Sequence, residues 1–130
     1  MIATLRIRAL LPLILLALST ACNAAESQTP SKRVLEALAL IRDGKQVGLR
    51  DYILQGDFKD KDVEEGAQVL YMLLSDAFRQ NGGVSGFEIE SEQIEGERAY
   101  VKFRCHYKNG NSNGDTFPLQ REQGKWRIRL

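Results

Sequence analysis

The sequence predicts an α+β domain, in which helices come first and an antiparallel sheet follows. Up to Gly83, apolar residues recur every three or four positions, which is the spacing of an amphipathic helix. After Gly83 they recur at every second position, which is the spacing of a half-buried strand. Helices followed by consecutive strands favour a fold in which the helices cover one face of the sheet.

Two helices are expected before residue 56. The first begins after Pro30, with Ser31 as its N-cap, and ends at Gly44, because serine caps helix N-termini and glycine suits the turn after a helix. The second helix is short and contains the apolar residues between Val47 and Leu54. The apolar stripe of the first helix consists of Val34, Leu35, Leu38 and Ile41.

A third and longer helix follows a loop around Gly56. Asp60 or Asp62 is expected to cap it, and Asn81-Gly82-Gly83 is a strong stop signal. One face of this helix is apolar and is expected to pack on the sheet; its members are Val63, Ala67, Leu70, Leu74, Ala77 and Phe78.

Four strands are expected after Gly83, separated by the turn sequences Glu95-Gly96, residues 109–114 and Gln123-Gly124. Because each connection is short, the strands form an antiparallel meander. We expect Trp126 to be buried between the sheet and the long helix. The alternation places these residues on the face toward the helices: Phe87, Ile89, Val101, Phe103, Phe117, Leu119, Trp126 and Ile128.

The N-terminal residues have the pattern of an export signal followed by a lipid-attachment cysteine. Two arginines precede an apolar run from Ala9 to Leu18, which is too short for a membrane span of about 20 residues. Small residues lead up to Cys22, the position that a bacterial lipobox acylates. We expect a signal peptide at residues 1–21, lipidated Cys22 with a flexible tether at residues 22–30, and one domain at residues 31–130.

Ordinary cleavage near Ala24 or Ala25 is the alternative, and it would leave a soluble periplasmic protein. If the lipid is attached to the Cys22 thiol, then Cys105 has no disulfide partner. We expect Cys105 to behave as a small buried apolar side chain.

Charge is distributed unevenly along the chain. Residues 26–97 contain eight basic and fifteen acidic side chains, a net charge of −7, whereas residues 98–130 contain eight basic and two acidic ones, a net charge of +6. We expect no nucleic-acid partner, no cofactor and no metal. The single histidine, His106, points away from the core by the alternation, whereas zinc sites take three or four protein ligands.

Several segments together resemble one family of proteins. They are Ile41-Arg42-Asp43-Gly44-Lys45, Asn81-Gly82-Gly83-Val84, Ile94-Glu95-Gly96-Glu97-Arg98-Ala99-Tyr100-Val101 and Gly124-Lys125-Trp126-Arg127-Ile128. With the lipid-attachment sequence in front, this order is similar to small bacterial lipoproteins of unknown function with a lumazine-binding-like domain. These belong to the superfamily of nuclear transport factor two, SnoaL and ketosteroid isomerase. The resemblance covers residues 31–130 and implies a curved sheet that wraps the helices into a cone, often with an apolar pocket.

The resemblance also bears on location and activity. In enteric-type lipoproteins, Asp after the lipidated cysteine retains the protein at the inner membrane; this chain has Asn23, which favours the outer membrane. Some members of the superfamily are enzymes, and many are binding or assembly modules. The lipoprotein group has no activity that can be carried over to this chain.

One interpretation of the sequence is a small-molecule carrier or an isomerase-like enzyme that uses the cone interior. For an enzyme of the ketosteroid isomerase type, the resemblance implies a site with an aspartate base inside an apolar pocket. Asp115 could face inward, but it borders a Gly/Asn loop, where a turn role is expected. We expect no catalytic residue. The residues that could line a pocket are Tyr71, Phe87, Tyr107 and Trp126.

The opposite face of the sheet is expected to be basic, because it contains Lys102, Arg104, Arg127 and Arg129. One interpretation is a solvated face with cross-strand ion pairs. The other is a contact surface for an acidic protein, a second copy of the chain or anionic lipid headgroups. We therefore expect a lipid-anchored periplasmic binding or assembly module without catalytic activity, which contacts a partner through this basic face.

Overall fold

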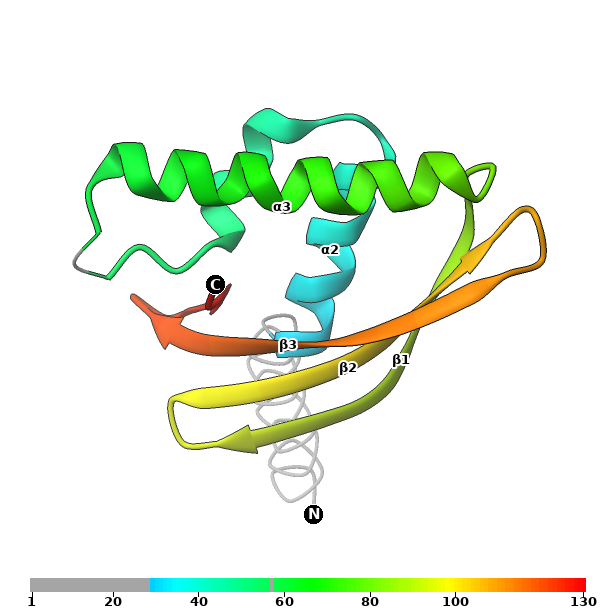
Figure 1. The fold of residues 1–130 in the computed structure, drawn as a ribbon. Coiled ribbons are helices and arrows are strands. Elements are labelled where there is room, and N and C mark those ends of the chain that lie inside the picture. The colour runs from blue at the N-terminus through cyan, green and yellow to red at the C-terminus, as the bar shows by residue number, and fades with distance from the viewer. Residues whose placement is uncertain (1–28, 57) are drawn as a thin grey trace, which may run out of the picture.

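The structure is a computed structural model, and it describes residues 29–56 and 58–130. The predicted signal peptide, Cys22 and nearly all of the tether lie outside these residues. The described elements are, in order, α2 (Pro30–Arg42), η1 (Gln46–Tyr52), α3 (Asp60–Gln80), β1 (Val84–Glu95), β2 (Arg98–Tyr107), β3 (Ser112–Glu122) and β4 (Lys125–Ile128). Figure 1 shows a curved sheet with α2 and α3 on its concave side, so the predicted fold class is confirmed.

The first helix starts slightly earlier than the sequence predicts. Thr29, and not Ser31, is the N-cap, because its hydroxyl accepts a hydrogen bond from the Lys32 backbone N–H at 3.2 Å. Pro30 occupies the first helical position, where its lack of an N–H leaves no donor unpaired. The Ser31 hydroxyl instead donates to the Glu92 carboxylate on β1 at 2.7 Å, so α2 begins beside the sheet.

The segment between α2 and α3 covers the edge of the sheet at β4. Gly44 follows α2 with a φ of 74°, as expected for the glycine after a helix. After η1, a 3-10 helix, Ile53 forms a parallel bridge with Ile128, and the Leu54 backbone N–H donates to the Ile128 carbonyl at 2.8 Å. This part of the β4 edge is therefore paired and not open to another strand.

The long helix α3 begins at Asp60 after Lys59, which makes no side-chain capping bond. The prediction that Asp60 or Asp62 is the cap is therefore wrong; both lie in the first turn, where negative charge is favourable at the positive end of the helix. The predicted stop is confirmed, since Gly82 and Gly83 both have positive φ. The buried residues of α3 are Val63, Ala67, Leu70 and Phe78, which belong to the predicted inner face.

The sheet is the predicted antiparallel meander, with strand order β1-β2-β3-β4. The pairing of β1 with β2 shifts register between Val84 and Gly86 and again between Ile89 and Ser91. Such bulges bend a strand and increase its twist. They account for the curvature that lets the sheet wrap around the helices (Figure 1).

The turn between β2 and β3 is shorter than the sequence predicts. The Tyr107 backbone N–H donates to the Asn111 carbonyl at 2.9 Å, which closes the turn early, and β3 already begins at Ser112. Asp115 consequently lies within β3 opposite Phe103, so the expected turn role for Asp115 is wrong.

The core between sheet and helices has the predicted composition. Trp126 is 2 % exposed, and Cys105 is a free thiol that is 1 % exposed. The rings of Phe103 and Phe117 pack with their centroids 4.7 Å apart. Other predicted inner-face residues are buried or partly buried in the same cluster: Phe87, Ile89, Val101, Leu119 and Ile128.

Candidate functional site

The four residues predicted to line a cone pocket do not come together. Phe87 and Tyr107 pack on the Phe78 ring, with centroid distances of 5.9 Å and 6.1 Å. Trp126 is placed near the other end of the sheet, where the Arg121 guanidinium lies 4.6 Å from its ring centroid. Tyr71 lines a separate hollow on the outside of the molecule with Gly44, Ser75, Arg79 and others.

The groups at the Tyr107 end of the core are poorly suited to proton transfer or nucleophilic attack. Burial raises the pKa of the Cys105 thiol to about 11, so the thiol stays protonated at neutral pH. Burial also raises the pKa of the Tyr107 hydroxyl, which donates to Asn113 at 2.7 Å. Asp115 shares the inner face with Phe103, its partner across the strands, but Asp115 is exposed to water. An enclosed carboxylate of the isomerase type is therefore not formed by Asp115.

The predicted basic face is largely neutralised by its neighbours. Glu90 on β1 forms ion pairs with both Arg104, at 2.8 Å, and Lys102, at 3.8 Å. His106 Nε2 lies 2.9 Å from a carboxylate oxygen of Glu88, which is also on β1. This arrangement matches the interpretation as a solvated face with cross-strand pairs, each worth roughly 0.2–1 kcal/mol.

The prediction that Arg127 lies on an exposed basic face is wrong, because Arg127 is only 5 % exposed. Its Nη1 donates to the Asp51 backbone carbonyl at 2.8 Å, and its Nε lies 3.2 Å from the Glu122 carboxylate, without the alignment of a hydrogen bond. The strand alternation was right, but η1 and the residues after it cover this part of β4. Arg127 on β4 thus links η1 to the sheet through its hydrogen bond to Asp51. Arg129 is half-buried, and its role as a partner contact stays a prediction together with those of Lys102 and Arg104.

A different surface has the character of a binding site, and it lies along α3. Two adjoining hollows, with volumes of about 140 Å³ and about 400 Å³, share Asp62, Gly66 and Leu130. We call the two hollows together the α3 groove. The other residues that line it are Ile53, Leu54, Phe58, Val63, Glu65, Val69, Leu70, Leu73 and Arg129.

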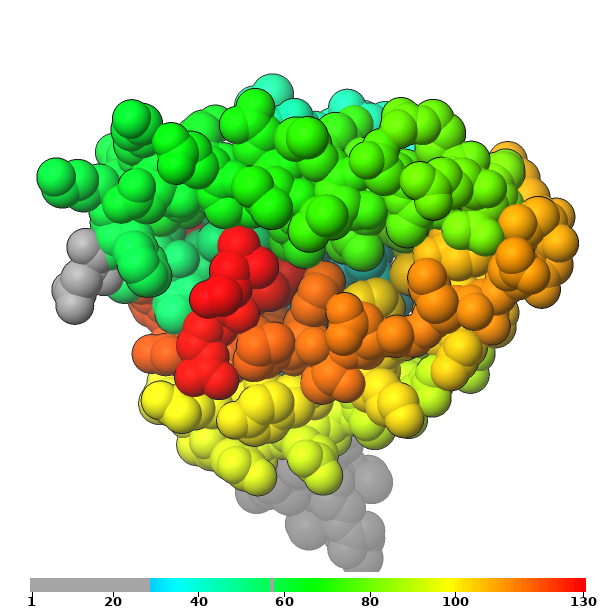
Figure 2. All heavy atoms as spheres, viewed as in Figure 1, coloured from blue at the N-terminus to red at the C-terminus, as the bar shows by residue number. Residues whose placement is uncertain are grey.

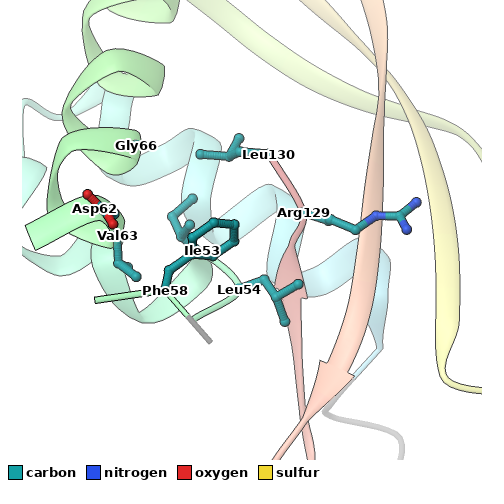
Figure 3. A pocket seen from close by; sticks show the side chains of 8 residues that line it. All are labelled: Ile53, Leu54, Phe58, Asp62, Val63, Gly66, Arg129 and Leu130. Carbon is teal, nitrogen blue, oxygen red and sulfur yellow. The ribbon is translucent and has the colours of Figure 1, made fainter. Parts of the chain in front are cut away.

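The smaller hollow lies between the start of α3 and the segment that follows η1. Figure 3 shows the side chains of Ile53, Phe58 and Leu130 turned toward one another, while the guanidinium of Arg129 points away from them. Gly66 lets the C-terminal residue approach α3, because a Cβ atom at this position would lie 3.1 Å from the Leu130 Cδ1. Two of these apolar side chains remain open to water, since Phe58 is 66 % and Leu130 is 64 % exposed.

The larger hollow continues along α3 beside a row of exposed apolar side chains. Val69 is 55 %, Met72 is 58 % and Leu73 is 67 % exposed. We call these three residues the α3 stripe. In Figure 2 the C-terminal residues lie directly below α3 on the same side of the molecule. Burying an apolar side chain of this size is worth about 1.5–3 kcal/mol, and the isolated fold leaves much of that unused here.

Acidic side chains surround the N-terminal end of the groove. Asp60 and Glu64 are already held by Arg50, at 2.6 Å and 3.2 Å. Asp62 lines both hollows and has no ion-pair partner among the residues that the structure describes. At the other end of α3, Arg79 is exposed and pairs with Asp76. The groove is therefore an apolar surface with acidic residues at its N-terminal end, and the basic residue Arg79 lies farther along α3, outside the groove.

Sequence reasoning missed the α3 stripe, although a signal was available. Residues 69–74 of the long helix are all apolar or aromatic: Val, Leu, Tyr, Met, Leu and Leu. A helix that packs on one sheet needs only one apolar stripe. The second row of apolar residues on this helix was the sign of an additional contact surface.

Comparison with known proteins defines the fold. No protein-family model and no curated protein matches the sequence. Among solved structures, the chain is similar to a protein from Campylobacter jejuni described as an NTF2-like transpeptidase, with a TM-score of 0.68 and 19 % identity over 78 % of this chain and 98 % of that one. It is also similar to a de novo designed protein with a curved β-sheet, with a TM-score of 0.53 and 21 % identity over 78 % of this chain and 82 % of that one. The chain has an NTF2-like fold, and identities this low extend no further than the fold.

Within residues 29–56 and 58–130, no helix combines the length and apolarity that a membrane crossing requires. In the same residues, no cluster of three or more His, Cys, Asp or Glu side chains is arranged to hold a metal ion.

Proposed function

We propose that the protein is a periplasmic binding or assembly module, anchored by a lipid on Cys22 to the outer membrane, that binds an apolar helix of a protein partner in the α3 groove. The observation that carries the proposal is the α3 stripe, whose three side chains are more than half exposed on a well-packed helix. A contiguous apolar surface with a polar rim is a common mark of a protein interaction site.

The shape of the surface favours a helix as the occupant. Val69, Met72 and Leu73 are spaced three and four residues apart, so they form a ridge along α3 beside an open hollow. Helices pack by fitting such ridges into the grooves of a partner helix. Asp62 on the groove favours a partner with a basic residue near one end of its apolar stretch.

The position of the expected anchor leaves this surface accessible. The Ser31 backbone N–H and hydroxyl both donate to Glu92 of β1, so the start of α2 lies at the sheet, and α2 leads from there toward α3 (Figure 1). Seven residues between Cys22 and Pro30 reach at most about 25 Å. A lipid on Cys22 would therefore hold the sheet side near the membrane, with α3 on the side away from the attachment point.

The core supports a binding role better than a chemical one. The Cys105 thiol is protonated and enclosed, and Asp115 is open to solvent. Phe87 and Tyr107 are engaged with Phe78 inside the packed core. The α3 groove, by contrast, is lined largely by apolar side chains, of which Val69 and Leu73 are more than half exposed.

Cysteine accessibility in native membranes tests the proposal. The full-length protein with Leu73→Cys is compared with Thr116→Cys, which is exposed on the sheet face opposite the helices. Cys105 contributes little background, because it is buried and its thiol is protonated. We expect a maleimide to modify Leu73→Cys slowly in membranes and quickly after dilution in detergent, while Thr116→Cys reacts equally in both.

Equal reactivity of Leu73→Cys in membranes and in dilute detergent would overturn the proposal. Protection of Thr116→Cys in its place would show that the partner covers the sheet face, as the charge pattern of the sequence first suggested.

A further inference from the structure

We infer that the helix in the α3 groove is α3 of a second copy of this chain, packed antiparallel about a two-fold axis. This inference rests on the proposed function, because it names the partner of the same surface. Such an isologous contact uses one surface twice, so the surface has to be complementary to itself.

The spacing along α3 fits an antiparallel helix pair. Asp62, Val69 and Asp76 follow one another at intervals of seven residues. A second series with the same interval, shifted by three positions, contains Glu65, Met72 and Arg79. Two series with this spacing lie along one face of a helix, as the a and d positions of a coiled coil do, and Val69 and Met72 are their apolar members. When two copies run antiparallel with Val69 opposite Met72, the exposed apolar residues of both copies meet at the centre, with Leu73 alongside.

The same alignment brings one pair of opposite charges together at each end, with one pair of acidic residues next to it. The pairing of position 69 with position 72 also pairs position 62 with position 79, so Asp62 of each copy faces Arg79 of the other. It pairs position 65 with position 76 as well, so Glu65 faces Asp76, the carboxylate whose charge Arg79 of the same helix offsets. Arg79 is exposed and already donates to one carboxylate, that of Asp76. A guanidinium has five N–H donors and can hold a second carboxylate. A parallel pair would instead place Asp62 against Asp62, which is unfavourable.

The two-fold axis is compatible with two anchors in one membrane. The groove with the C-terminal residues faces the viewer in Figure 2, and α3 runs across the view. An axis that relates two antiparallel helices across this face is perpendicular to α3 and runs from α3 toward the sheet. Rotation about it leaves the starts of both α2 helices on the same side of the assembly (Figure 1).

The contact is small, which explains why a membrane anchor matters for it. Three exposed side chains of α3 and one C-terminal leucine per copy cover less than the roughly 800 Å² per partner of a standard stable interface. Anchors that hold both copies in one plane raise their effective concentration without any new contact. We therefore expect a dimer in membranes and dissociation on dilution in detergent.

Disulfide crosslinking between two tagged versions of the full-length chain tests the inference. One version has Asp62→Cys and the other has Arg79→Cys, and both are produced in the same cells. We expect an oxidant to link the two versions to each other, and each version to link poorly to itself. In the antiparallel pair, two copies of the same position are 17 residues apart along the helix axis, which is about 26 Å. Thr116→Cys is the matched control and is expected to form no dimer.

Charge exchange supplies a second and independent readout. Arg79→Asp and Asp62→Arg should each reduce the amount of dimer trapped by a lysine-reactive crosslinker in membranes. The double variant, with both changes in one chain, should restore it, because each copy then presents the exchanged charges to the other.

The outcomes separate this inference from the proposed function. Self-linking of Asp62→Cys alone would show a parallel pair and overturn the inference. If no link forms while Leu73→Cys is still protected in membranes, the groove holds a different protein: the inference fails and the proposed function stands. If no link forms and Leu73→Cys reacts equally everywhere, both are wrong.

Discussion

Replacing Arg127 by alanine removes the centre of a buried ion-pair cluster and should destabilise the domain. Arg127 Nη1 donates to the Asp51 carbonyl at 2.8 Å, and its Nε lies 3.2 Å from the Glu122 carboxylate. Breaking a buried ion pair costs about 3–5 kcal/mol when the remaining charge has no other partner. Here the Asp51 side chain is half exposed, and Glu122 keeps hydrogen bonds from the Gln55 and Gly56 backbone N–H groups. We therefore expect a smaller loss, about 2–3 kcal/mol.

A loss of this size is easy to measure by equilibrium urea unfolding. Domain stabilities are about 5–15 kcal/mol, so the change is a large fraction of the total. With a urea dependence of about 1–3 kcal/mol per molar, the midpoint should fall by about 0.7–3 M. The single tryptophan, Trp126, is next to the altered residue and reports on this part of the fold by its fluorescence.

Arg104→Ala is the matched control, because Arg104 pairs with Glu90 on the solvated side of the same sheet. An exposed pair is worth about 0–1 kcal/mol, so this variant should unfold close to the wild type. If Arg127→Ala and Arg104→Ala had the same midpoint, the argument that burial makes Arg127 structural would be refuted.

Three further predictions concern the core and the anchor. Trp126→Ala should cost about 3–5 kcal/mol, measured by urea unfolding followed by circular dichroism, because it removes a buried aromatic ring; an unchanged midpoint would contradict the packing. Burial raises the pKa of the Cys105 thiol from 9.0 to about 11, so the folded state disfavours the thiolate, and this contribution to stability should be lost as pH rises from about 9 to about 11. Cys105→Ala should remove that part of the pH dependence of the urea midpoint, and an identical pH profile in both proteins would be evidence against it. Cys22→Ala should prevent incorporation of a palmitate analogue and release the protein from the membrane fraction; wild-type protein without label would show that the lipid is absent.

Regular periodicity explains which parts of the fold could be predicted from the sequence. The alternation around Trp126 and Ile128 places both on the buried face, and the structure confirms this. The glycines after the first and third helices also end those helices as predicted. These features depend on neighbours that are close in sequence, so a local pattern is sufficient to predict them.

The errors arise where distant segments decide the outcome. Ser31 is a good capping residue, but Glu92 on β1 provides its hydroxyl with another acceptor, and Thr29 takes the cap. Arg127 faces the side that the alternation predicts, yet η1 folds over it and Asp51 pairs with it. Neither contact can be inferred from residues nearby in the sequence.

The candidate site was missed for a different reason. The prediction assigned six apolar residues of the long helix to one buried face and left Val69, Met72 and Leu73 unassigned, although Val63 and Leu70 on the predicted face already belong to the buried side of the helix. Val69, Met72 and Leu73 point away from that face. A helix with two apolar sides indicates either a larger core or a binding surface, and only the burial of individual residues separates these two interpretations.

The most direct test of the account is the reactivity of Met72→Cys in native membranes, with and without Leu73→Asp in the same chain. Leu73 is 67 % exposed, so Leu73→Asp should change the unfolding free energy by no more than about 0.5 kcal/mol. It should nevertheless place a charge in the middle of the proposed contact. We predict that Met72→Cys is protected from maleimide when Leu73 is present and becomes fully reactive when it is replaced by Asp. Full reactivity of Met72→Cys in both proteins would mean that the α3 groove is bare in the membrane, and it would contradict the central claim.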